Sequence, residues 1–117
     1  MLMNRRNSLL MIIDVQERLA SAMDDPRQVI SNSARLVGAA KAMGVPFVIT
    51  EQYPKGLGQT MIDVRQEAGD EAAFFSKLYF SCAREPEIMR AIQESGRRQI
   101  ILAGAETHIC LLQTAMD

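Results

Sequence analysis

Cys110 follows a predicted strand at the point where the chain turns into a predicted helix. The apolar run at residues 100–103 is typical of a strand, and the segment from Glu106 onward is typical of a helix. Backbone N–H groups in the first turn of a helix are unpaired and the helix dipole is positive there, so this position favours a thiolate. Because the thiolate is the nucleophilic form of cysteine, Cys110 is a candidate catalyst.

An acid and an amine stand at the ends of two other predicted strands. Asp14 closes the apolar run at residues 9–13, and Lys77 closes a short predicted strand at residues 74–77. Asp14 could accept the proton of the thiol, and Lys77 could stabilise both anions. Backbone N–H groups around Cys110 could hold a developing oxyanion. This combination of residue types favours nucleophilic catalysis by an activated thiol.

Each of these residues also has a purely structural interpretation. A cysteine at a strand–helix junction is usually a small buried hydrophobe, and Cys82 is expected to be one. Asp14 could cap the exit from its strand, although burying an acid is costly unless it is paired. Lys77 could be an ordinary surface lysine. The residue types and spacing alone leave these alternatives open.

The alternation of predicted strands and helices indicates how these residues are brought together. Strands are predicted at residues 9–13, 45–49, 74–77 and 99–103, helices at 28–43 and 86–96, one or two helical turns at 61–70, and a loop at 53–58. Such alternation predicts an α/β fold, a three-layer doubly wound (Rossmann-like) parallel sheet with helices on both faces. In open sheets of this type the site lies beyond the carboxyl ends of the strands.

Composition narrows the class of protein. With 117 residues, 48% of them hydrophobic and 23% charged, the chain has the make-up of one ordinary globular domain. Its net charge of -1 argues against a nucleic-acid partner or a membrane-surface role, because both need a concentrated basic face.

Location is predicted from the same sequence. The two cysteines make no disulfide framework, and the apolar run that ends at Asp14 is too short for the core of a signal peptide. No stretch approaches the length of a membrane span. A cytoplasmic protein without a membrane partner is therefore expected.

Three segments of the chain, in this order, resemble the isochorismatase-like cysteine hydrolase superfamily. They are LLMIIDVQ at residues 9–16, FSKLYFS at 75–81 and GAETHICLLQTA at 104–115. The resemblance spans almost the whole chain. The segment TEQYPKGLG at residues 50–58 is more similar to the uncharacterised isochorismatase-domain hydrolases than to the nicotinamidases.

The resemblance implies a catalytic triad of Asp14, Lys77 and Cys110. Cys110 would attack a carbonyl carbon to form a thioester, and Asp14 would carry the proton from the thiol to the leaving amine. The resemblance also implies a cis peptide between Ala105 and Glu106. That bond would direct the N–H groups of Glu106 and Cys110 into one oxyanion hole.

Three further residues are candidates for the substrate pocket, namely Gln16, Tyr53 and Phe80. Gln16 could orient Asp14 or merely bond to nearby backbone. Tyr53 and Phe80 could line a substrate slot or belong to the ordinary core.

The metal site of the nicotinamidases has no counterpart in this sequence. Nicotinamidases hold a metal with an Asp-x-His pattern after the second strand, whereas this chain has Glu51-Gln52-Tyr53 there. The single histidine, His108, is assigned no role. We therefore expect no metal, and we expect no cofactor. The resemblance also implies a small-molecule substrate that is cleaved at an amide or related C–N bond, and a homo-oligomer, which is common in the family.

The domain of the resembled family continues past the nucleophile helix with further strands and helices. Residues 1–117 are therefore expected to form a single domain that lacks its C-terminal strands. Two other functions stay open. The chain could be an incomplete or non-catalytic domain that acts in oligomeric assembly, or it could hydrolyse a vinyl ether as isochorismatase does. The presence of Cys110 favours acyl transfer.

Overall fold

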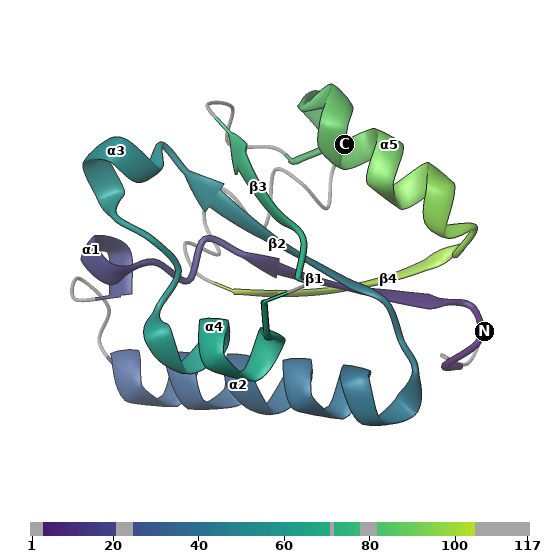
Figure 1. The fold of residues 1–117 in the computed structure, drawn as a ribbon, viewed down its shortest axis with the longest axis horizontal. Helices are drawn as coiled ribbons and strands as arrows, with labels where there is room; N and C mark the ends of the chain where they lie inside the picture. Colours follow the sequence, from purple (N-terminus) through teal and green to yellow (C-terminus); the bar gives the residue numbers. More distant parts are fainter. Residues whose placement is uncertain (1–3, 21–24, 71, 78–81, 105–117) are drawn as a thin grey trace.

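A parallel β-sheet forms the centre of the molecule (Figure 1). The computed structural model describes residues 4–20, 25–70, 72–77 and 82–104. Within these ranges the sheet has four strands in the order β3-β2-β1-β4. The strands are β1 (Ser8–Ile13), β2 (Phe47–Gln52), β3 (Phe74–Lys77) and β4 (Gln99–Gly104).

The central strand β1 is buried along its whole length, as its continuous apolar sequence predicts. It pairs in parallel with β2 on one side and β4 on the other, so Ile13 lies opposite both Thr50 and Gly104. On the far side of β2, Gln52 lies opposite Lys77 of β3. This register brings the carboxyl ends of all four strands to one edge.

Helices cover both faces of the sheet (Figure 1). Helices α2 (Pro26–Met43) and α4 (Ile62–Ala68) lie on one face, and α5 (Pro86–Ser95) lies on the other beside a short 3-10 turn, η1 (Cys82–Arg84). Alternate side chains of β1 point to opposite faces of the sheet, and each face has its own hydrophobic core. Leu10 packs in the first core, between the sheet and helices α2 and α4, and Met11 packs in the second core, between the sheet and α5. The predicted doubly wound α/β architecture is confirmed.

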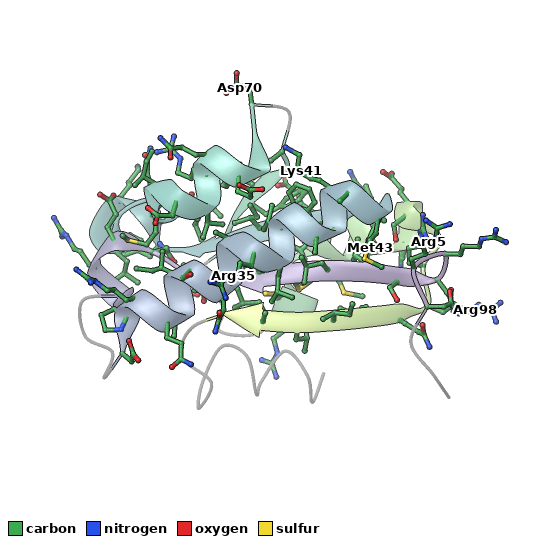
Figure 2. All side chains as sticks on the ribbon, turned by 90° about the horizontal axis from the view of Figure 1, so that it is seen from below. Arg5, Arg35, Lys41, Met43, Asp70 and Arg98 are labelled. Atoms are coloured by element: carbon green, nitrogen blue, oxygen red, sulfur yellow. The ribbon has the colours of Figure 1, made fainter. Side chains whose placement is uncertain are left out.

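Local sequence signals set the two ends of α2. The side chain of Asp25 accepts a hydrogen bond from the backbone N–H of Gln28 at 3.2 Å, and Pro26 begins the helix. Gly44 ends it in the left-handed conformation, with φ of 72°. Side by side with α2, helix α4 is held by Lys41, whose Nζ donates to the Glu67 carbonyl oxygen at 3.0 Å (Figure 2).

Two expectations about the region after the second strand are wrong. The strand predicted at residues 45–49 is β2, which begins at Phe47 and continues to Gln52, because its last residues pair with β3. The segment predicted as a loop contains a short helix, α3 (Pro54–Leu57). Earlier in the chain, directly after β1, lies a further short helix that the sequence does not predict, α1 (Glu17–Ala20). The helical turns predicted at residues 61–70 are confirmed as α4.

An apolar hollow of about 210 Å³ lies at the amino end of the sheet, between α2 and strands β1 and β4. Arg5 and Met43, labelled in Figure 2, both line it. The hollow therefore lies at the edge opposite to Asp14. Among the described residues, no helix is both long enough and apolar enough to cross a bilayer.

Substitution of Gly104 should destabilise the protein strongly. Its φ is 141°, and an added Cβ would lie 2.1 Å from the carbonyl oxygen of Ile13, which is backbone and cannot rotate away. We expect Gly104→Ala to lower the free energy of unfolding by about 3 kcal/mol or more. Gly96→Ala is the matched control, since Gly96 has φ of 69° but open space around it. Its cost should be only about 1 kcal/mol. Equal losses in urea unfolding would contradict the steric argument.

Candidate active site

Asp14 occupies the turn that follows β1 and is completely buried, with 0% of its surface exposed. Its φ is 57°, a left-handed conformation that aspartate tolerates better than most residues. The turn is fixed by backbone hydrogen bonds, because Asp14 N donates to Thr50 O at 3.1 Å and Gln16 N donates to Asp14 O at 3.0 Å. The carboxylate is thus held at the carboxyl edge of the sheet.

Lys77 and Asp14 form an ion pair in which neither side chain is exposed. The distance from Lys77 Nζ to Asp14 Oδ2 is 3.0 Å. The ion pair is the firm contact, since within the described residues Oδ2 accepts no hydrogen bond of good angular geometry. Because charges removed from water must be paired, each residue accounts for the burial of the other. The interpretation of Lys77 as a surface lysine is wrong.

Both ions have a neutral partner on β2. Thr50 Oγ1 donates to Asp14 Oδ1 at 2.9 Å, and Lys77 Nζ donates to Gln52 Oε1 at 2.7 Å. Sequence reasoning missed these two residues because it ended the strand at residue 49. The available signal was a β-branched threonine two positions before Gln52, the spacing that places both on one face of a strand.

Gln16 is fully buried and bonds to backbone. Its Nε2 donates to the carbonyl oxygens of Gln52 at 3.0 Å and Gly58 at 2.8 Å, and its Oε1 accepts from Gln52 N at 2.7 Å. The amide therefore joins the end of β2 to the loop after α3.

Tyr53 comes directly after β2 and lies at the protein surface. It has φ of 39°, its side chain is 52% exposed, and its backbone N donates to Lys77 O at 3.0 Å. Glu51, two residues before Tyr53, directs its carboxylate at Thr60, and its Oε2 accepts hydrogen bonds from Thr60 N at 2.6 Å and Thr60 Oγ1 at 2.8 Å. In the part of the chain that the structure describes, no group of three His, Cys, Asp or Glu side chains gathers as a metal site.

Cys82 is buried in the second core, as expected. Its Sγ lies 3.9 Å from Thr50 Oγ1, to which it donates a weak hydrogen bond. The remaining predicted site residues lie outside the described ranges, namely Phe80, Ala105, Glu106 and Cys110, as does His108, to which no role is assigned. The peptide bond between residues 105 and 106, predicted to be cis, lies outside them as well.

The described part of the site is a buried carboxylate with a fixed counter-ion. A buried carboxylate with one oxygen bonded to a hydroxyl and the other facing an ammonium can accept and return a proton without leaving its place. The ammonium can stabilise whichever neighbouring group carries the negative charge. A proton acceptor and a nearby cation are the two groups that activate a nucleophile.

The doubly wound sheet with this buried acid–amine pair at its carboxyl edge has recognisable relatives. The isochorismatase domain family matches residues 8–117. Isochorismatase domain-containing protein 1 of Danio rerio is 39% identical over 111 residues, which are 94% of this chain and 38% of that protein.

Solved structures agree with this match. A structure described as MAR1 ribonuclease from Caenorhabditis elegans superposes with a TM-score of 0.90 at 36% identity, over 98% of this chain and 58% of that one. The YcaC gene product of Escherichia coli, described as an octameric hydrolase of unknown specificity, gives 0.86 at 19% identity, over 97% and 57%. At that identity the likeness to YcaC shows the fold alone.

The match over residues 8–117 shows that this chain belongs to the isochorismatase family. The chain spans only part of these relatives, from 38% of the zebrafish protein to 58% of the nematode one.

Removing one charge of the ion pair should destabilise the protein more, per substitution, than removing both charges together. Lys77→Met leaves a buried carboxylate without its counter-ion, and Asp14→Asn leaves a buried ammonium, so each should lose about 3–5 kcal/mol of unfolding free energy. The double variant should lose clearly less than the sum, because neither charge is then stranded. Urea unfolding of the four proteins measures this difference. Lys55→Met at an exposed position is the control and should change stability by less than about 0.5 kcal/mol. Additive losses at residues 14 and 77 would contradict the pairing.

Proposed function

We propose that this chain is a cysteine hydrolase that cleaves a small amide or related C–N bond through a thioester intermediate. Cys110 is the nucleophile, Asp14 moves the proton and Lys77 stabilises the anions. The observation that carries the proposal is the buried ion pair between Asp14 and Lys77, 3.0 Å apart, at the edge where parallel sheets of this type bind ligands.

The proposed reaction has two halves. In the first, the Cys110 thiol gives its proton to the Asp14 carboxylate, and the sulfur attacks the carbonyl carbon. The carbonyl electron pair moves to oxygen, which the N–H groups of Glu106 and Cys110 hold. When the electron pair returns, the C–N bond breaks and the leaving amine takes the proton from Asp14. The product of this half is a thioester on Cys110.

In the second half, water attacks the thioester carbon and gives one proton to Asp14. The C–S bond then breaks, a carboxylic acid leaves, and the sulfur regains the proton that Asp14 holds. Across the two halves, one water is consumed and each proton that Asp14 accepts is returned. The ammonium of Lys77 faces Asp14 when the acid is charged, and it supports the thiolate when Asp14 is protonated.

The contacts of Asp14 support its role as the proton carrier. Oδ1 is engaged by Thr50 Oγ1, which leaves Oδ2 as the oxygen whose only contact among the described residues is ionic. Because both side chains are fully buried, the charges act in a low-dielectric region where they are worth more than in water. Glu51 is already bonded to Thr60, which supports a mechanism that uses no metal ligand there.

RNA is a second candidate substrate, because the structure described as MAR1 ribonuclease is 36% identical to this chain. The net charge of -1 provides little general attraction for phosphates, so we favour the small amide. By analogy with the octameric YcaC protein, we also propose that the chain assembles as a homo-oligomer.

The reactivity of Cys110 tests the mechanism before a substrate is known. We expect iodoacetamide to alkylate Cys110 with an apparent pKa below the roughly 8.5 of a free cysteine, because in the proposed triad the ammonium of Lys77 stabilises the thiolate. Lys77→Met should raise that value toward 8.5. Peptide mapping distinguishes Cys110 from the buried Cys82, which serves as the internal control. An apparent pKa near the roughly 8.5 of a free cysteine that does not change in Lys77→Met would contradict the mechanism. It would favour the alternative that the chain is an incomplete or non-catalytic domain that acts in assembly.

A substrate panel tests the reaction type. Hydrolysis of small amides should disappear in Cys110→Ala, at least about a thousandfold down, because no other group forms the thioester. A vinyl ether and an RNA oligonucleotide form the other arms of the panel. Turnover of either that survives Cys110→Ala would contradict the acyl-transfer mechanism and identify the competing activity.

A further inference from the structure

Strand β2 separates the two strands whose ends carry the ions. Asp14 follows β1, Lys77 ends β3, and β2 lies between them in the sheet. Thr50 is opposite Ile13, and Gln52 is opposite Lys77. Being two positions apart on one strand, Thr50 and Gln52 present their side chains to the same face. That face is the one on which the ion pair forms.

Thr50 makes the two oxygens of Asp14 different from each other. Its hydroxyl carries a single proton, which it donates to Asp14 Oδ1 at 2.9 Å, while its oxygen accepts the weak bond from Cys82 Sγ. Thr50 is itself completely buried, so water cannot replace this donor. Hydrogen bonds to a charged acceptor are about twice as strong as neutral ones. The carboxylate is therefore fixed in rotation.

Gln52 holds Lys77 in a comparable way and is itself held from behind. Its Oε1 accepts from Lys77 Nζ at 2.7 Å. Its backbone N–H and C=O both bond to the side-chain amide of Gln16, at 2.7 Å and 3.0 Å. This reciprocal pair of bonds imitates the pairing of a neighbouring strand. Gln16 is 0% exposed, so the backbone that carries the Gln52 side chain is held by a buried group.

We propose that Thr50 and Gln52 are positioning residues, which act through Asp14 and Lys77 to keep the carboxylate and the ammonium in one fixed arrangement. Neither residue is proposed to touch the reacting atoms. The link to catalysis rests on the proposed function, whereas the positioning itself can be tested without any substrate.

Acetylation of lysine by acetic anhydride tests the positioning of Lys77 directly. The rate at Lys77 is compared by peptide mapping with the rate at exposed Lys55 in the same sample. Gln52→Met keeps the length of the side chain but removes the acceptor, and we expect it to raise the relative rate at Lys77 about tenfold. Gln52→Glu retains an acceptor and should keep Lys77 protected. No change in Gln52→Met, or equal deprotection in Gln52→Glu, would overturn the role of Gln52.

The pair Thr50→Val and Thr50→Ser tests the other ion and does not depend on how Gln52→Met folds. Valine has the shape of threonine without its donor, and serine restores the hydroxyl. Thr50→Val should move the midpoint of Cys110 alkylation in the same direction as Asp14→Asn, and it should add nothing in an Asp14→Asn background. Thr50→Ser should return the midpoint to the unsubstituted value. A shift that adds to that of Asp14→Asn would show a structural effect instead.

The two readouts separate the two proposals. If Asp14→Asn and Lys77→Met leave Cys110 alkylation unchanged, the proposed catalytic function fails, and the acetylation result alone decides whether Gln52 positions Lys77. If both substitutions change alkylation but the variants at residues 50 and 52 change neither readout, the catalytic function stands and the positioning proposal fails.

Discussion

The burial of Asp14 beside Lys77 is the constraint on which the rest of the site depends. Two opposite charges 3.0 Å apart, with no exposed side-chain surface, are tolerable only if their separation is fixed and their remaining polar atoms are bonded. The strands that carry them are not neighbours, so the register of β2 against both sides sets the distance. Thr50 and Gln52 provide the neutral bonds from that same strand.

The sheet and its main helices could be predicted from sequence because their signals are local. The buried run at β1 and the capped helix α2 each carry a pattern that needs no partner to be recognised. The short helices α1 and α3 could not be predicted because contacts across the chain define them. Glu17 Oε1, for example, accepts a hydrogen bond from Gln59 N at 3.0 Å. Such contacts exist only once the strands have set the ends of both segments.

The site divides in the same way. Asp14 could be found because an acid that closes an apolar strand is costly to bury without a partner, whereas Lys77 is distinguished from a surface lysine mainly by the resemblance of residues 75–81 to the family. The residues that contact Asp14 and Lys77 could not be predicted in the same way, because they lie at the end of β2. Thr50, Glu51 and Gln52 are polar and lie beyond the strand predicted at residues 45–49, yet pairing with β3 continues the strand through them. The length of β2 depends on its pairing with β3, and the amino-acid composition of β2 alone does not reveal that pairing.

The order of the strands in the sheet has a consequence for how the chain is made. β1 lies inside the sheet between β2 and β4, yet among the described strands it leaves the ribosome first and β4 leaves it last. Ser8 must wait for Gln99 before it meets its partner. Until then the nascent chain carries an almost wholly apolar strand with one edge unpaired, a surface that other chains and chaperones bind. This edge of β1 is therefore open to aggregation throughout the synthesis of the residues between β1 and β4.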